Sequence, residues 1–167
     1  WLSRMLAGGE NPLYIARRLV GFAGEGIGLA DPQALVQAIA AKDAYDFLGS
    51  PEGELALVQC VLYLATAPKS NAAYMAQKAA MRDAGAYGPL MPPMHILNAP
   101  TKLMQDIGYG KDYAYDHQQE DAFSGQNYFP DGMARAQYYH PAERGFEREI
   151  IKRLEYWQKL REKKSQP

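Results

Sequence analysis

Glycines and lysines are the first residues to consider for chemistry, because a glycine-rich turn followed by a lysine can cradle a phosphate. The stretch Gly24–Gly28 holds three glycines, but no strand pattern precedes it and Asp31 opens the next helix. A carboxylate at that position would repel a phosphate. Lys69 follows a proline and Lys111 precedes an aspartate, so neither lies in a phosphate-binding loop. We therefore expect these glycines to end a helix, and we predict no nucleotide-binding residue.

A second group of residues could do acid-base or metal chemistry. It consists of Asp116, His117, Glu120 and Asp121. A catalytic zinc site takes three defined protein ligands, and the other two histidines, His95 and His140, are distant in the sequence. The single cysteine, Cys60, lies in an apolar run and is expected to be a small buried side chain in a protein of a reducing compartment. We predict no catalytic residue and no metal ligand, and we interpret the acidic group as a solvated polar turn.

Tyrosines form the third candidate. Six of the twelve tyrosines fall between Tyr109 and Tyr139, in a segment, 87–145, that glycines and prolines keep irregular. We call this segment the strap. With Lys111 and Arg135 nearby, its rings could stack single-stranded bases. The alternative is structural: the rings pin the strap onto helices, since a loop of this length is improbable without such anchors.

Helix-start signals show what must position these residues. Asn11-Pro12, Asp31-Pro32 and Ser50-Pro51 lie 20 and 19 residues apart, and each precedes a run rich in Ala, Leu and Ile. Asn, Asp and Ser accept hydrogen bonds from a first helical turn, and proline suits its first position. The predicted helices are 1–7, 12–23, 32–48, 51–65, a fifth from Ser70 or Asn71 to 84, a short one at 101–107, and a last one from Phe146.

The predicted fold is therefore all-α: a compact array of six to seven helices, with the aromatic strap before the last one. The 51–65 helix is apolar almost all round, so we expect it to be the central and most buried element. The 12–23 helix and the last helix each carry their own apolar stripe. Apolar residues in excess of what one helical layer buries usually mark an interface, which predicts self-association.

Composition indicates one soluble domain, 1–167. The chain has 167 residues, of which 47% are hydrophobic and 22% charged, with a net charge of -1. No global positive field would hold it on DNA or on an anionic membrane. The apolar run Leu55–Pro68 is shorter than the roughly 17 to 25 residues of a membrane span. Helical composition begins at Trp1 without a cap, which favours a carboxyl-terminal piece excised from a larger protein.

Six ordered motifs resemble the carboxyl-terminal region of the replication-associated recombination protein A family of AAA+ ATPases, which includes the Werner-helicase-interacting ATPase. They are Asn-Pro-Leu-Tyr-Ile-Ala-Arg-Arg-Leu-Val at 11–20, Ile-Gly-Leu-Ala-Asp-Pro at 27–32, Ala-Pro-Lys-Ser-Asn at 67–71, Asn-Ala-Pro-Thr-Lys at 98–102, Gly-Tyr-Gly-Lys-Asp-Tyr at 108–113 and Tyr-Phe-Pro-Asp at 128–131. The resemblance covers essentially the whole chain. One departure from the family's pattern is Glu25-Gly26, where the family's usual sequence resembles Glu-Asp.

The resemblance implies a clamp-loader-collar-like helical domain that assembles its parent into a homotetramer acting at stalled replication forks. It implies that ATP and Mg bind the parent's missing portion, so this chain is no enzyme and holds no cofactor. It also implies DNA as a partner of the full-length protein, single-strand-binding protein as a further partner, no membrane, and a cytoplasmic, nucleoid-associated location.

Three functions are thus open: an oligomerisation domain, a recognition module for single-stranded DNA or a replication partner, and a stand-alone enzyme using 116–121. The candidate interface or recognition residues are Lys69, Asn71, Tyr109, Lys111, Tyr113 and Tyr115.

Overall fold

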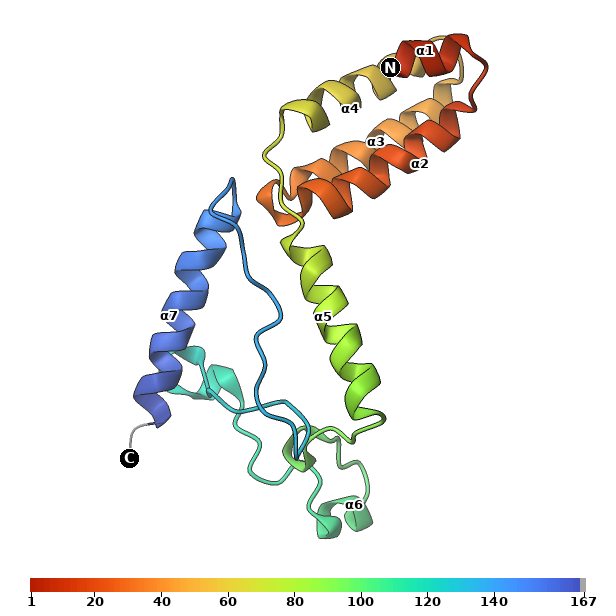
Figure 1. Cartoon of the computed structure of the whole chain (residues 1–167). Coiled ribbons are helices and arrows are strands. Elements are labelled where there is room, and N and C mark those ends of the chain that lie inside the picture. Colours follow the sequence, from red (N-terminus) through yellow and green to blue (C-terminus); the bar gives the residue numbers. More distant parts are fainter. Residues whose placement is uncertain (166–167) are drawn as a thin grey trace. The chain divides into compact units, whose positions relative to one another are not determined.

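The computed structural model describes residues 1–165. This part of the chain holds seven α-helices and no strand, which confirms the all-α prediction (Figure 1). The helices are α1 Leu2–Ala7, α2 Pro12–Phe22, α3 Gln33–Leu48, α4 Glu54–Thr66, α5 Ala72–Tyr87, α6 Lys102–Ile107 and α7 Glu147–Ser165. None of the helices in residues 1–165 combines the length and apolar character that a membrane span needs.

The backbone divides into two compact units. Unit 1 comprises residues 1–79 and 138–152, and unit 2 comprises residues 80–137 and 153–165. Helices α5 and α7 each begin in unit 1 and end in unit 2. The expectation of one domain over 1–167 stays a prediction.

In unit 1, the start of α2 confirms the sequence signal. The Asn11 side chain accepts a hydrogen bond from the Leu13 backbone N at 2.9 Å, with Pro12 at the first helical position. The prediction that the glycines end this helix is wrong in part. The backbone continues through a π-helical turn, Ala23–Ile27, and it leaves the helical path only at Gly28, whose φ of 54° is easy for glycine.

Helix α3 starts as expected, because Asp31 accepts a hydrogen bond from the Gln33 backbone N at 3.1 Å. Helix α4 begins at Glu54, so the prediction of a start at Pro51 is wrong. The reason is the Ser50 hydroxyl, which lies 3.1 Å from the Tyr45 hydroxyl instead of capping a helix, while residues 50–53 form a turn.

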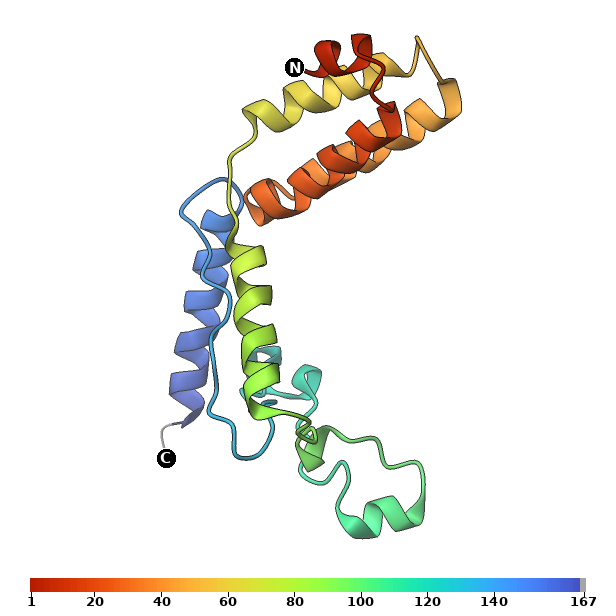
Figure 2. The same ribbon diagram turned by 45° about the vertical axis from the view of Figure 1, so that its right-hand side comes forward.

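The core of unit 1 consists mainly of small side chains. It contains Ala23, Ile27, Ala34, Ala38, Ala41, Cys60, Leu64 and Ala67. Helices α2, α3 and α4 pack together around it, as Figures 1 and 2 show from two sides. Helix α4, expected to be the central and most buried element, buries only one side: Leu57, Cys60 and Leu64 are buried, whereas Leu55 and Leu62 are 70% and 63% exposed.

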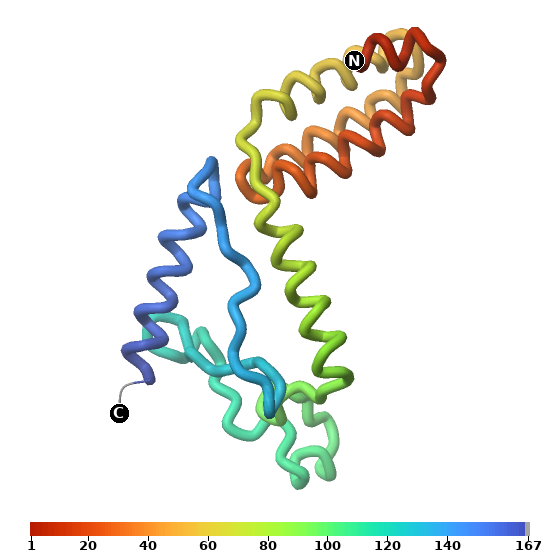
Figure 3. The backbone as a smooth tube through the Cα atoms, viewed as in Figure 1, coloured from red at the N-terminus to blue at the C-terminus, as the bar shows by residue number. Residues whose placement is uncertain are grey.

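The last part of unit 1 is the end of the strap and the first turns of α7. Figure 3 traces this extended stretch, in light blue, into α7. The Phe146 backbone N donates to the Ala30 carbonyl at 2.8 Å, and Gly145 lies so close to Ala30 and Pro68 that a β-carbon would clash. The predicted helix start near Phe146 is confirmed, since α7 begins at Glu147.

Unit 2 holds the rest of the strap. Thr101 caps α6 by accepting from the Met104 backbone N at 3.3 Å, which confirms the predicted short helix. The idea that tyrosine rings pin the strap stays a prediction; Tyr113 and Tyr115 are 50% and 49% exposed, so each ring is half buried. Another ring of the strap contacts α7: the guanidinium of Arg161 lies 5.4 Å from the centre of the Phe123 ring.

Candidate functional site

The structure separates the candidate residues into two groups. Lys69 and Asn71 lie in unit 1, in the linker between α4 and α5. Tyr109, Lys111, Tyr113 and Tyr115 lie in unit 2, directly after α6. The two groups thus belong to different units, and the recognition role of all six residues stays a prediction.

Lys69 closes the carboxyl end of α4. Its ammonium donates to the Leu64 carbonyl at 3.0 Å, to the Ala65 carbonyl at 3.3 Å and to the Ala67 carbonyl. A lysine has three donors, and a cation suits the negative end of the helix dipole. The geometry thus explains Lys69 as a helix cap whose donors are all in use.

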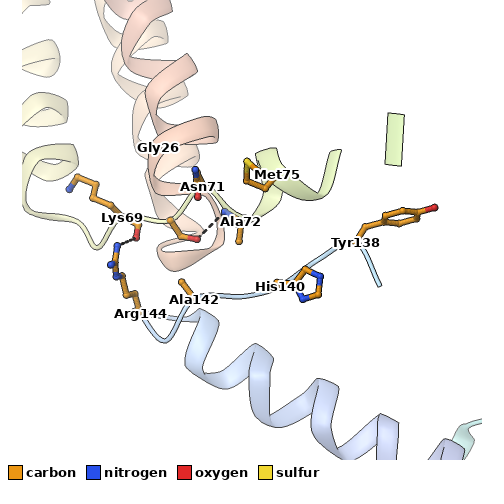
Figure 4. Close-up of a pocket in the computed structure, with 10 residues that line it drawn as sticks. Gly26, Lys69, Asn71, Ala72, Met75, Tyr138, His140, Ala142 and Arg144 are labelled. Carbon is orange, nitrogen blue, oxygen red and sulfur yellow. Dashed lines mark hydrogen bonds between the residues drawn. The ribbon is translucent and has the colours of Figure 1, made fainter. Parts of the chain in front are cut away.

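A cavity of about 600 Å³ opens beside Lys69 within unit 1 (Figure 4). Its lining comes from the π-helical turn, the α4–α5 linker and the end of the strap, and it comprises Gly26, Lys69, Ser70, Asn71, Ala72, Met75, Tyr138, His140, Ala142 and Arg144. Two hydrogen bonds hold these segments together. The Ser70 backbone N donates to the Gly26 carbonyl at 3.1 Å, and the Arg144 guanidinium donates to the Lys69 carbonyl at 3.2 Å.

No signal in the sequence pointed to Arg144 and His140, because they lie about 70 residues from Lys69 and Asn71 in an irregular segment. Only the return of the strap to unit 1 brings them to the linker. A positively charged residue in an irregular loop has no periodic neighbours from which a contact with the α4–α5 linker could be predicted.

A buried carboxylate fixes the end of the strap. Glu147 is fully buried, and it accepts from the Tyr139 hydroxyl at 2.7 Å and from the Ala142 backbone N at 2.9 Å. Burial and the neighbouring Glu147 charge raise the pKa of the Tyr139 phenol well above its usual range. The sequence offers Glu147 only as an acidic residue of a first helical turn, which does not reveal its burial.

In unit 2, a smaller hollow of about 320 Å³ is lined by residues of both charges. Its lining comprises Pro93, Met94, His95, Gly108, Lys111, Asp112, Gln126 and Asp131. The Gln126 side chain ties the hollow's rim together: it donates to the Asp112 carbonyl at 2.8 Å and accepts from the Ala114 backbone N at 3.0 Å. Of the candidate residues in unit 2, only Lys111 reaches this hollow.

The acidic group at 116–121 is a local turn in the structure. Asp116 accepts from the Ser124 backbone N at 2.7 Å, and hydrogen bonding by Ser124 lowers the pKa of this carboxyl. The rings of Tyr115 and His117 lie 5.1 Å apart at a tilt of 53°. Within residues 1–165, no three His, Cys, Asp or Glu side chains come together as metal ligands would.

Unit 1 also exposes large apolar side chains on α3 and α4. On α3 the buried positions are Ala34, Ala38 and Ala41, whereas Leu35, Val36, Ile39 and Phe47 are exposed. Leu55 and Leu62 extend the exposed set onto α4. We call these six side chains the apolar face.

Comparisons with known proteins agree along nearly the whole chain. The family model described as MgsA AAA+ ATPase C terminal matches residues 1–158. The chain is 49% identical to replication-associated recombination protein A of Coxiella burnetii over 163 residues, which are 97% of this chain and 37% of that protein. It is 46% identical to the protein of the same name from Escherichia coli K12, over 92% of this chain and 35% of that protein.

A eukaryotic relative is also similar. ATPase WRNIP1 of Dictyostelium discoideum is 44% identical over 142 residues, which are 83% of this chain and 16% of that protein. The chain thus spans about a third of the bacterial relatives and less of this one, and their ATP-binding region lies in the remainder. This chain belongs to the family of carboxyl-terminal domains of MgsA AAA+ ATPases.

Proposed function

We propose that this chain is the homo-oligomerisation domain of an AAA+ ATPase that acts on DNA in replication and recombination. The observation that carries the proposal is the apolar face of unit 1. On α3 the buried residues are all alanines, whereas most of the large apolar residues are exposed, which inverts the usual arrangement of a helix in a monomeric protein. Such a surface is typical of a protein interface.

Energetics favour a symmetric contact between copies. Burying a Val, Leu, Ile or Phe side chain stabilises by ~1.5–3 kcal/mol, and association costs an estimated ~4–15 kcal/mol. An isologous contact uses each patch residue twice, once from each copy. Four fully exposed positions per copy would contribute about 12–24 kcal/mol when buried, a range whose upper part exceeds the cost of association.

The number of copies and the biological setting rest on relatives. The family resemblance supports a tetramer, and the name that the bacterial relatives carry supports replication and recombination. Four copies would raise the local concentration of the attached ATPase modules on one DNA substrate. ATP, Mg and DNA would then be bound by the full-length protein, with single-strand-binding protein as a further partner and the nucleoid as the location.

The test is the solution mass of the chain by light scattering coupled to size exclusion. We expect a species near four times the chain mass of 18.6 kDa at micromolar concentration. The double substitution Leu55→Glu with Leu62→Glu should shift it to the monomer, because it places two carboxylates in the interface of each copy. Leu103→Glu is the matched control, since Leu103 is 68% exposed but lies on α6 in unit 2.

A monomeric wild-type chain across micromolar dilutions would overturn the proposal. If the double variant stayed a tetramer, assembly would not depend on the apolar face. Circular dichroism of both variants keeps the test interpretable, because substitutions of exposed residues should leave the helical signal intact.

A recognition function is the second candidate, supported by the half-exposed rings of Tyr113 and Tyr115. Aromatic faces open to solvent can stack single-stranded bases, and Lys111 adds a positive charge two residues before Tyr113. Replacement of each tyrosine by Ala should then weaken oligonucleotide binding without changing the solution mass. An affinity that both variants retain would contradict this function.

A further inference from the structure

Helix α2 presents a positively charged face to solvent in unit 1. Arg17 and Arg18 are exposed, and α2 itself holds no acidic residue. Neither arginine takes part in any ion pair that the structure shows among residues 1–165. The Tyr14 ring, 46% exposed, lies about one turn before them on the same helix. We call Tyr14, Arg17 and Arg18 the α2 face.

The carboxyl-terminal end of α3 and the turn after it have the opposite charge. Asp43, Asp46 and Glu52 are exposed there. Only Lys42 opposes them locally, with its ammonium 3.3 Å from the Asp43 carboxylate and 2.5 Å from that of Asp46. Three carboxylates against one ammonium leave a charge of -2. Phe47 stands among them at 88% exposure, and we call Asp43, Asp46, Phe47 and Glu52 the α3 corner.

The α2 face and the α3 corner match each other chemically. Two arginines give the α2 face a charge of +2 against the -2 of the α3 corner. Arginine pairs with carboxylates through two donors and also stacks on aromatic rings, so it suits a surface that offers both groups. Arginine and aromatic residues are also enriched at protein interfaces. Helices α2 and α3 lie side by side in unit 1 (Figures 1 and 2), so every copy of the chain carries both surfaces.

We propose that the α2 face of one copy binds the α3 corner of a second copy. This inference rests on the proposed self-association and names the surface that receives Phe47, the most exposed side chain of the apolar face. Because each copy has both surfaces, the contact is reciprocal: the arginines of each copy meet the carboxylates of the other. The charge pairs set the orientation of the two copies, and the apolar side chains supply most of the buried area.

The salt dependence of the wild-type chain gives a first test, which needs no substitution. Attraction between exposed charges is screened as the ionic strength rises, so assembly through these pairs should weaken in salt. We expect the protein concentration at which half of the assembly dissociates to rise at least about threefold from low to high sodium chloride. A purely apolar contact would not weaken in this way.

The decisive experiment exchanges the charges of the two surfaces. One variant carries Arg17→Glu with Arg18→Glu, and the other carries Asp43→Lys with Asp46→Lys. In either variant alone, like charges face each other across the contact. In an equimolar mixture, the introduced carboxylates of the first variant meet the introduced ammonium groups of the second, and the native groups left on each variant still match.

Light scattering of the whole chain measures assembly, and native mass spectrometry identifies mixed particles. Glu and Lys are good helix formers, so α2 and α3 should stay folded, which circular dichroism checks. The matched control, Lys102→Glu with Lys159→Glu, reverses two exposed charges in unit 2 and changes the net charge as the arginine variant does.

We expect each charge-reversed variant alone to need at least about tenfold more protein to assemble, and the mixture and the control to stay within about threefold of wild type. Variants that assemble like the wild type, or a wild type that salt does not weaken, would overturn this inference and leave the proposed self-association standing. Losses that the mixture does not reverse, or an equal loss in the control, would overturn it as well. A monomeric wild-type chain would overturn both proposals.

Discussion

Removal of one hydroxyl, by Tyr139→Phe, tests how the strap is held in unit 1. The Tyr139 hydroxyl donates to the fully buried Glu147 carboxylate at 2.7 Å, and the Ala142 backbone N is the other donor that the structure shows on that carboxylate. A buried carboxylate that loses one of two donors is left partly unsatisfied. Hydrogen bonds to charged groups contribute ~1.5–3 kcal/mol, so we expect a loss of about 2 kcal/mol in the free energy of unfolding.

Thermal unfolding followed by circular dichroism measures this loss. For a chain of this length, 1 kcal/mol corresponds to about 2–4 °C in Tm, so Tm should fall by about 4–8 °C. Tyr45→Phe is the matched control, because its hydroxyl meets the exposed Ser50 hydroxyl at 3.1 Å. Its cost should stay within about 0.5 kcal/mol.

A double-mutant cycle that combines Tyr139→Phe with Glu147→Gln measures the coupling energy between the two side chains. Residues in one hydrogen-bond network show coupling energies of ~0.5–3 kcal/mol, whereas independent sites add within about 0.5 kcal/mol. Equal Tm values for Tyr139→Phe and Tyr45→Phe, or additive losses in the cycle, would refute the account of Glu147 as the anchor of the strap.

Three further predictions concern the strap and the nucleotide. Tyr113→Ala and Tyr115→Ala should each lower the free energy of unfolding by less than about 1.5 kcal/mol, because both rings are half exposed; loss of a buried ring costs ~3–5 kcal/mol. Chemical denaturation measures this loss, and a larger value would show that the rings pin the strap. The Tyr139–Glu147 hydrogen bond should stabilise the fold fully up to about pH 10, the ordinary pKa of a phenol, and its contribution should be lost as the pH rises through the raised pKa of Tyr139. The difference in stability between wild type and Tyr139→Phe should therefore shrink only above pH ~10. Calorimetry should detect no micromolar ATP binding by the chain, since neither Lys69 nor Lys111 follows a phosphate-binding glycine loop; measurable binding would contradict this.

Local signals in the sequence predicted the helices well where the cap is local. Asn11 and Asp31 bond to backbone N atoms two residues away, and Thr101 to one three residues away, so each signal is complete within one turn. Ser50 failed as a predictor because its hydroxyl meets Tyr45, a residue of the preceding helix. The local sequence around Ser50 does not show that its hydroxyl bonds to another side chain instead of capping the next helix.

Burial was predictable only in part. The apolar residues of α4 indicated a buried element, but hydrophobicity alone does not say whether the burial is within one chain or between copies. The candidate site shows a second limit, since its cavity depends on His140 and Arg144, which reach the linker through the tertiary course of the strap. No spacing rule connects residues so far apart in the sequence.

The composition of the unit 1 core supports the proposed assembly from an independent direction. Alanines fill five of its eight positions, so the helices approach closely but bury little apolar area per residue. Because stabilisation scales with that area, a core of this kind gains less than one built from leucines. The larger side chains that would supply the difference stand on the apolar face, among them Phe47 at 88% exposure. Contact between copies would bury them, and on this reasoning the stability of unit 1 should rise with protein concentration, as expected when folding and association are linked.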